Sequence, residues 1–142
     1  MMNKGFTLVE ILATVVILGI IAAIAIPQFT PTTTQANTSV VSSDLQAIRM
    51  AIEYYKIQHS DANPGTMVGV SFVQAMTQKT DPDGTLNPAG IRGPYIQRVP
   101  TNPFNALSTV EEDGVLGGGD NGWHYDTTTG EFHADTDGQT GL

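Results

Sequence analysis

A single carboxylate, Glu10, lies near the start of a stretch that is otherwise suited to lipid. Residues 6–29 contain no Lys, Arg, Asp, His or Asn, and Glu10 carries their only formal charge. Placing a carboxylate within a bilayer costs at least ~2 to 3 kcal/mol, so such a group usually has a functional partner. We expect Glu10 to pair with a cation. Because no second acid, base or nucleophile accompanies it, we do not expect it to be catalytic.

Two histidines near the end of the sequence form a second group that could do chemistry. A hairpin around residues 127–130 would place His124 opposite His133. It would also place Asp126 opposite Glu131 on the same face. Histidines paired across a ladder can share a metal ion, and nearby carboxylates could complete the site. A solvated polar face is the simpler interpretation, because no third ligand is evident.

Composition and charge limit the classes of function. The chain has 142 residues, a formal net charge of −8 and no cysteine, so it can form no disulfide and no thiolate site. From Val99 onward it contains eight acids and no Lys or Arg. We expect no nucleic-acid partner, because phosphate binding needs a basic surface. The sequence also lacks a Ser/His/Asp motif, an HExxH motif and a P-loop, so we do not expect an enzyme.

Apolar periodicity predicts a long amphipathic helix after the apolar stretch. The residues that recur at spacings of three and four, and so share one helix face, are Val41, Leu45, Ile48, Ile52 and Tyr55. This helix is predicted to end near His59, because residues 61–65 are helix breakers. Pro27 should bend the helix, because its ring removes a backbone hydrogen bond.

The second half of the sequence predicts a small domain with short elements. Residues 71–78 are expected to form a short helix capped by Ser71. Three strands are expected to form a small antiparallel sheet over residues 107–110, 122–126 and 131–135. The side chains assigned to the core face of the hairpin are Trp123, Tyr125 and Phe132. The predicted fold class is therefore α+β, with a long N-terminal helix packed on a small antiparallel sheet.

The residues around Glu10 resemble a known family. Lys4 stands in a short basic leader that ends in Gly5, Phe6 follows, and Glu10 is the fifth residue after Gly5. This arrangement resembles the processing and N-methylation motif of type IV pilins and of the pseudopilins of type II secretion systems. Residues 93–105 also resemble the connector of major pseudopilins, with a Gly-Pro-Tyr sequence followed by a Pro-x-Asn-Pro-like segment.

The resemblance implies a processing step and a set of segments. Prepilin peptidase would cut after Gly5, and the new amino group on Phe6 would be methylated. That ammonium group would pair with Glu10 of a neighbouring subunit and set the register of assembly. The implied segments are a leader over residues 1–5, a hydrophobic transmembrane and filament-core helix over 6–29, an amphipathic helix over 30–60 and a small periplasmic or extracellular α+β domain over 61–142.

The resemblance also implies partners and a location. The expected product is a homo-oligomeric filament, assembled with an inner-membrane platform and minor pseudopilins. Before assembly, the subunit would be a single-pass inner-membrane protein with a cytoplasmic N-terminus. No cofactor is expected apart from calcium, which the resemblance would place near the C-terminal end. The candidate calcium ligands are Asp120, Asn121, Asp135 and Asp137, although simple acidic solvation competes with that interpretation.

Two other functions stay open on the sequence. One is a minor or ligand-binding pilin of a type IV pilus or a competence system. The other is an uncleaved membrane-anchored enzyme or metal-binding domain. Processing discriminates between these classes, because a pilin-like chain loses five residues and polymerises, whereas an anchored enzyme does neither.

Overall fold

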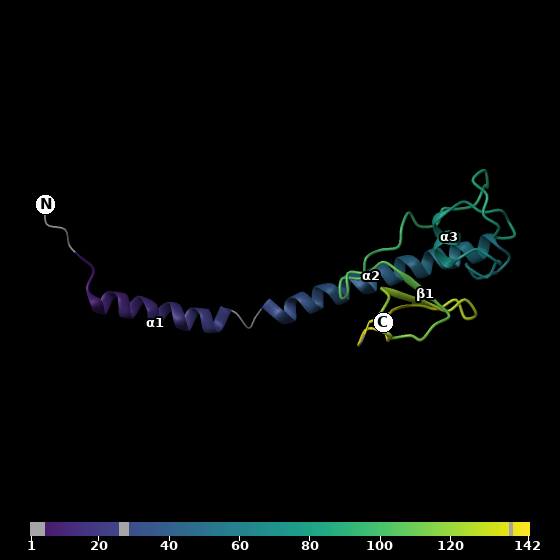
Figure 1. The fold of residues 1–142 in the computed structure, drawn as a ribbon. Coiled ribbons are helices and arrows are strands. Elements are labelled where there is room, and N and C mark those ends of the chain that lie inside the picture. Colours follow the sequence, from purple (N-terminus) through teal and green to yellow (C-terminus); the bar gives the residue numbers. More distant parts are fainter. Residues whose placement is uncertain (1–4, 26–28, 137) are drawn as a thin grey trace. The chain divides into compact units, whose positions relative to one another are not determined.

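The computed structural model describes residues 5–25, 29–136 and 138–142 (Figure 1). The chain divides into two compact units, Met1–Ala36 and Asn37–Leu142, and each is described by itself. The bend predicted at Pro27 lies outside the described residues.

Helix α1 (Leu8–Ala25) lies in the first unit and carries no charge after Glu10. Its described side chains, over residues 8–23, are all exposed. A continuous exposed surface of large aliphatic side chains marks a contact site, because water is a poor solvent for it. Among the described residues, no helix combines the length and the hydropathy that crossing a membrane requires.

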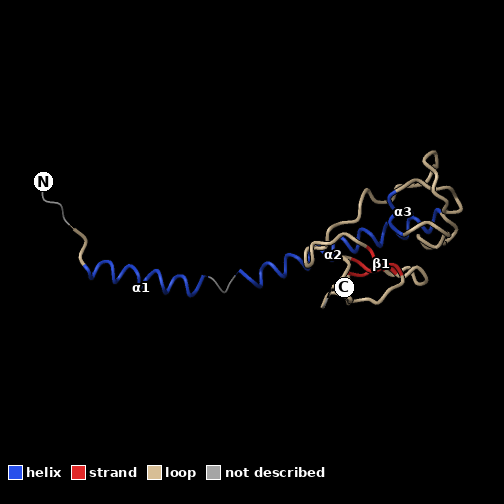
Figure 2. The backbone as a smooth tube through the Cα atoms, in the orientation of Figure 1, coloured by secondary structure: helices blue, strands red, loops and turns tan. Residues whose placement is uncertain are grey.

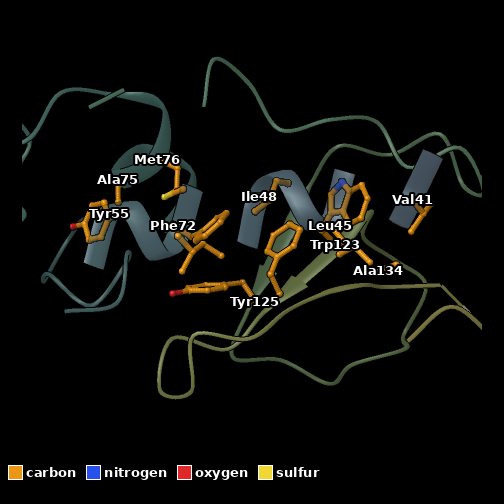
Figure 3. Packing of buried hydrophobic residues seen from close by; sticks show 12 residues of the cluster. Val41, Leu45, Ile48, Tyr55, Phe72, Ala75, Met76, Trp123, Tyr125 and Ala134 are labelled. Atoms are coloured by element: carbon orange, nitrogen blue, oxygen red, sulfur yellow. The ribbon is translucent and has the colours of Figure 1, made fainter. Parts of the chain in front are cut away.

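Helix α2 (Phe29–Gln58) supplies the core face of the second unit. It ends one residue before His59, so its predicted end is confirmed. All five side chains of the predicted apolar face are buried, with at most 2% of their surface exposed. Figure 3 shows four of them, Val41, Leu45, Ile48 and Tyr55, in a cluster with side chains of a second helix and of the sheet.

Helix α3 (Phe72–Thr77) is held at its start by a capping box. The Ser71 hydroxyl accepts the Gln74 backbone N–H at 3.2 Å, and the Gln74 side-chain oxygen accepts the Ser71 backbone N–H at 3.0 Å. This reciprocal pair satisfies two donors that a helix start would otherwise leave free. The predicted helix and its Ser71 cap are confirmed, and Phe72 and Met76 are buried.

The sheet has three short strands in the order β1–β2–β3: β1 (Val110–Glu112), β2 (Trp123–Tyr125) and β3 (Phe132–Ala134) (Figure 2). Strands β2 and β3 are antiparallel, with Tyr125 opposite Phe132 and His124 opposite His133, so the predicted hairpin register is confirmed.

Strand β1 differs from its prediction in both position and direction. It begins at Val110 instead of Leu107, and it runs parallel to β2, so the sheet is mixed and not wholly antiparallel. The reason is the connection over residues 113–122. A tight turn makes the next strand antiparallel to the one before it. A long connection can carry the chain back to the end of the sheet where the first strand began, so the next strand runs parallel to it.

The connector that follows α3 is anchored by backbone and side-chain hydrogen bonds. The N–H groups of Tyr95 and Ile96 donate to the Met76 carbonyl oxygen at 2.8 and 3.1 Å. The Trp123 indole donates to the Pro100 carbonyl oxygen at 2.8 Å. The connector side chains that were expected to pack on the core are partly buried against it, namely Tyr95, Ile96, Val99 and Phe104.

Candidate functional site

The first turn of α1 is capped by a reciprocal pair of side chains, Thr7 and Glu10. Glu10 Oε2 accepts the Thr7 backbone N–H and the Thr7 hydroxyl, each at 2.9 Å. In return, the Glu10 backbone N–H donates to the Thr7 hydroxyl oxygen at 3.3 Å. This is a capping box, with Thr7 as the N-cap residue and Glu10 three positions later. The negative charge also lies where the helix dipole favours it.

The capping role of Glu10 is a feature that our sequence reasoning missed. The signal was present, because Thr and Glu three residues apart before an apolar run are typical of a helix start. The sequence predicted a partner for this carboxylate in a neighbouring subunit. The structure shows a partner within its own chain, and the pairing with a neighbouring subunit stays a prediction.

The residues around the predicted cleavage point precede the helix. Gly5, Phe6 and Thr7 are outside α1 and exposed, and Phe6 has 83% of its surface exposed. A peptidase can reach such a segment without unfolding a helix. The structure thus brings together an accessible Gly5–Phe6 bond and, one turn later, the Glu10 carboxylate.

Two of the candidate calcium ligands, Asn121 and Asp135, lie close together, but the contact between them is a hydrogen bond from a backbone N–H group. Asp135 is fully buried, but its Oδ1 accepts the Gly117 N–H at 2.6 Å and its Oδ2 accepts the Asn121 N–H at 3.3 Å. Asp120 is exposed. Calcium takes six to eight oxygens, and the described Asp135 carboxylate holds a loop through two backbone N–H groups. Asp137 lies outside the described residues, and the calcium site stays a prediction.

The paired histidines lie where the hairpin predicted them, but their face is not fully solvated. His124 is only 6% exposed, and its Nε2 lies 3.1 Å from the Gly114 carbonyl oxygen. The expectation of a solvated face is wrong at His124, because the loop after β1 lies over it. His133 Nε2 lies 3.6 Å from a Glu131 carboxylate oxygen. The described residues include no set of three His, Asp or Glu side chains arranged to hold a metal.

Burial raises the pKa of several ionisable groups in the domain, and two of them, Glu112 and Tyr125, lie near the start of α3 and in the sheet. Glu112 Oε1 accepts the Phe72 N–H at 2.9 Å at the start of α3, and burial raises the pKa of this carboxyl group despite that hydrogen bond. Burial also raises the pKa of the Tyr125 hydroxyl. Both groups belong to the packing of the domain.

A capped, exposed methylation motif on an apolar helix, together with a small α+β domain, defines a pilin-like subunit. The family described as the prokaryotic N-terminal methylation motif matches residues 1–26. Type II secretion system core protein G of Pseudomonas aeruginosa is 36% identical over 130 residues, which are 84% of this chain and 90% of the relative. The chain therefore belongs to the family of type II secretion system core protein G, the major pseudopilins.

Other relatives agree with this assignment. Core protein G of Klebsiella pneumoniae is 32% identical over 104 residues, covering 73% of this chain and 71% of the relative. Type IV major pilin protein PilE1 of Neisseria gonorrhoeae is 27% identical over 115 residues, covering 80% of this chain and 47% of the pilin. No solved structure matches the chain. The chain is thus a pseudopilin, a structural subunit and not an enzyme.

Proposed function

We propose that this chain is processed as a prepilin and then polymerises into a type II secretion pseudopilus. Prepilin peptidase would cut after Gly5, and the new amino group on Phe6 would be methylated. The match of residues 1–26 to the methylation-motif family supports this proposal, as does the exposure of the segment before α1. The observation that carries it is a capped Glu10 in a helix that otherwise holds no charge.

In the filament, Glu10 would have two partners at the same time. In the single chain only Oε2 accepts the two bonds from Thr7. Because a carboxylate offers about four acceptor sites, it can accept an ammonium group while it keeps its cap. In the filament that ammonium would be the amino terminus on Phe6 of a neighbouring subunit. Leaving one charge of such a buried pair alone costs about 3 to 5 kcal/mol, which is enough to select one register of stacking.

The first experiment is intact mass and N-terminal sequencing of the chain recovered from its own cells. A mature chain that starts at Phe6 and carries one additional methyl group would support the proposal. A chain that starts at Met1 or Met2 would contradict it and favour an uncleaved anchor.

Three variants separate the two roles of Glu10. Glu10→Gln keeps a side-chain acceptor for the cap but cannot pair with an ammonium group, whereas Glu10→Ala removes both interactions. Thr7→Ala removes the hydroxyl from the cap and keeps the carboxylate. We expect both Glu10 variants to be cleaved normally and to lose incorporation into filaments, and Thr7→Ala to be incorporated. Normal assembly of Glu10→Gln would show that the ion pair does not set the register.

We also propose that the subunit waits in the inner membrane as a single-pass protein with a cytoplasmic N-terminus. The position of Lys4 directly before the apolar run supports this orientation. The small domain would then lie in the periplasm, where an assembly platform and minor pseudopilins would be partners. Protease added to spheroplasts should digest the domain, and a protected domain would reverse the orientation.

Calcium binding is a separate proposal that rests on the family resemblance and on the buried Asp135 carboxylate. If calcium is bound, removing it with EGTA should lower the melting temperature of the full chain. Adding calcium back should restore the melting temperature, and magnesium should not. Equal melting temperatures with and without EGTA would refute a calcium site.

A further inference from the structure

The outward face of the sheet carries two neighbouring histidines. His124 on β2 and His133 on β3 are paired across the hairpin, so their side chains lie side by side. Their strand neighbours Trp123, Tyr125 and Phe132 are buried in the core, and alternate residues of a strand point to opposite faces. The two imidazole rings therefore share the face that is turned away from the core. We name these two residues the histidine pair.

Each ring of the histidine pair has one nitrogen that faces an oxygen atom. His124 Nε2 lies 3.1 Å from the Gly114 carbonyl oxygen, and His133 Nε2 lies 3.6 Å from a Glu131 carboxylate oxygen. Carbonyl and carboxylate oxygens can only accept, so both contacts favour the neutral ring that carries its hydrogen on Nε2. The other ring nitrogen, Nδ1, then has a lone pair and no hydrogen.

The two Nδ1 atoms are buried, and neither has a hydrogen-bond partner in the described part of the chain. His124 as a whole is only 6% exposed. Buried polar atoms of side chains normally have a partner, and a bound ion is one explanation of an exception. His59, the third histidine, differs in this respect. Its two ring nitrogens lie 2.9 Å from the Tyr55 carbonyl oxygen and 2.9 Å from the Thr80 hydroxyl oxygen.

We propose that the histidine pair binds a divalent transition-metal ion through its two Nδ1 atoms. Imidazole nitrogen is a preferred ligand of copper, nickel and zinc. A histidine that binds a metal usually donates its other ring N–H to a carbonyl or carboxylate oxygen, which fixes the ring. Gly114 and Glu131 supply these oxygens. The described residues include no set of three ligating side chains, so water would fill the remaining positions of the ion.

The charges around the histidine pair suit a cation. Glu111 on β1 is the strand partner of His124, so it belongs to the same row across the sheet. Its side chain lies against Gly114, where an added Cβ would collide with the carboxylate oxygen. Glu131 lies beside His133. Carboxylates therefore flank the histidine pair, and their negative charge favours the approach of a divalent cation.

The loop over residues 113–122 forms the other side of the proposed site. Its Gly114 carbonyl contacts His124, and Asp135 holds the loop through the N–H groups of Gly117 and Asn121. Residues 113–116 and 118–120 are exposed. An ion could therefore enter by a movement of this loop, without unfolding of the core. The site differs in chemistry from the candidate calcium site, because calcium prefers oxygen ligands and the histidine pair offers nitrogen.

The test adds Cu²⁺, Ni²⁺ or Zn²⁺ to the full-length chain in detergent. Trp123 is the only tryptophan and directly precedes His124, so copper or nickel bound at the histidine pair should quench its fluorescence, and zinc should compete with them. His124→Gln and His133→Gln each remove one ligand nitrogen and keep a polar side chain. Asp120→Asn is the matched control, because it removes an exposed acid of the neighbouring loop and no imidazole ring.

We expect saturable binding of one ion to the parent chain, with Cu²⁺ bound more tightly than Ni²⁺ or Zn²⁺. Each histidine variant should raise the Kd for Cu²⁺ by about tenfold or more. Asp120→Asn should leave this Kd nearly unchanged, and added calcium should not displace the ion. Absence of saturable binding to the parent chain would overturn the inference. Unchanged binding by either histidine variant would also overturn it, because the metal would then be an adventitious ion only.

A second measurement needs no variant, and so does not depend on whether a variant folds. Pulsed electron paramagnetic resonance of the copper-loaded parent chain counts the imidazole rings that bind the ion. We expect two rings, and a count of one or none would overturn the inference. Both measurements use the unassembled chain, so their outcome is independent of prepilin processing and of polymerisation.

Discussion

Arg49 holds α2 against the edge of the sheet, and removing its guanidinium group should destabilise the domain measurably. Its Nε and Nη2 donate to the Phe132 carbonyl oxygen at 3.1 and 2.9 Å, and Nη2 also donates to the Leu142 carbonyl oxygen at 2.7 Å. Arg49→Met keeps most of the aliphatic stem and removes all three hydrogen bonds. Two carbonyl oxygens then lose a charged donor.

The expected magnitude follows from these bonds and from the half-buried position of Arg49. A hydrogen bond from a charged donor contributes roughly 1.5 to 3 kcal/mol, and water can replace part of it at a half-buried site. We therefore expect Arg49→Met to lower the free energy of unfolding by about 2 to 3 kcal/mol in total. With a urea dependence of about 1 to 3 kcal/mol per molar, the unfolding midpoint should fall by roughly 0.7 to 3 M.

Trp123 is suited to this measurement, because it is the only tryptophan and is fully buried. Urea unfolding of the full chain in one detergent can be followed by its fluorescence. Lys56→Met is the matched control, because it also removes one positive charge but breaks only the surface pair with Glu53 at 3.2 Å. Lys56→Met should lower the free energy of unfolding by less than about 1 kcal/mol. Equal losses in the two variants would refute the role of the hydrogen bonds and point to net charge.

Two further predictions concern groups that hold the loops. Asn102 is fully buried, and its side-chain amide donates to the Gly122 carbonyl oxygen at 2.8 Å while its side-chain oxygen accepts the Phe104 N–H at 3.0 Å. Asn102→Ala should lower the free energy of unfolding by about 2 to 4 kcal/mol in the same urea assay, because one buried and one half-buried backbone group lose their partners. A loss below that of Lys56→Met would contradict this account. For Glu112, burial raises the pKa above the ordinary value of 4.5 for this group, so the folded chain holds this proton more tightly than the unfolded chain. Its contribution to stability should therefore rise as the pH falls through the folded pKa, and should be complete below 4.5. The test compares the free energy of unfolding of the parent chain with that of Glu112→Gln over this pH range. As the pH falls, the parent chain should gain stability relative to the variant. A difference that does not depend on pH would refute the assignment.

Several features of the fold follow from local sequence. The core face of α2 was predictable from Val41 to Tyr55, because a helix buries residues that recur every three or four positions. The capped start of α3 was predictable at Ser71 for a similar reason, since a cap involves only residues of the same turn. The β2–β3 register was predictable because the loop over residues 127–130 is short and fixes which residues face each other. The Thr7–Glu10 cap is equally local, and its sequence signal was overlooked.

Other features depended on the path of the chain in space. The direction of β1 is set by the connection over residues 113–122, and the sequence of that connection does not specify where it returns. The burial of His124 depends on the Gly114 loop, and the Arg49 hydrogen bonds join residues that are more than eighty positions apart. Asp135 likewise accepts hydrogen bonds from the backbone of a loop that only the fold brings near, and its expected role as a calcium ligand stays a prediction.

The sequence by itself determined the processing motif, the apolar helix with Glu10, the amphipathic face of α2 and the hairpin. Each of these is a relation between residues close in sequence, so helical or strand periodicity is sufficient to specify it. The tertiary structure alone decided the parallel pairing of β1, the surroundings of His124 and the contacts of Arg49. These depend on contacts between distant segments, and such contacts form only where the packing of the whole domain repays the entropy of closing long loops.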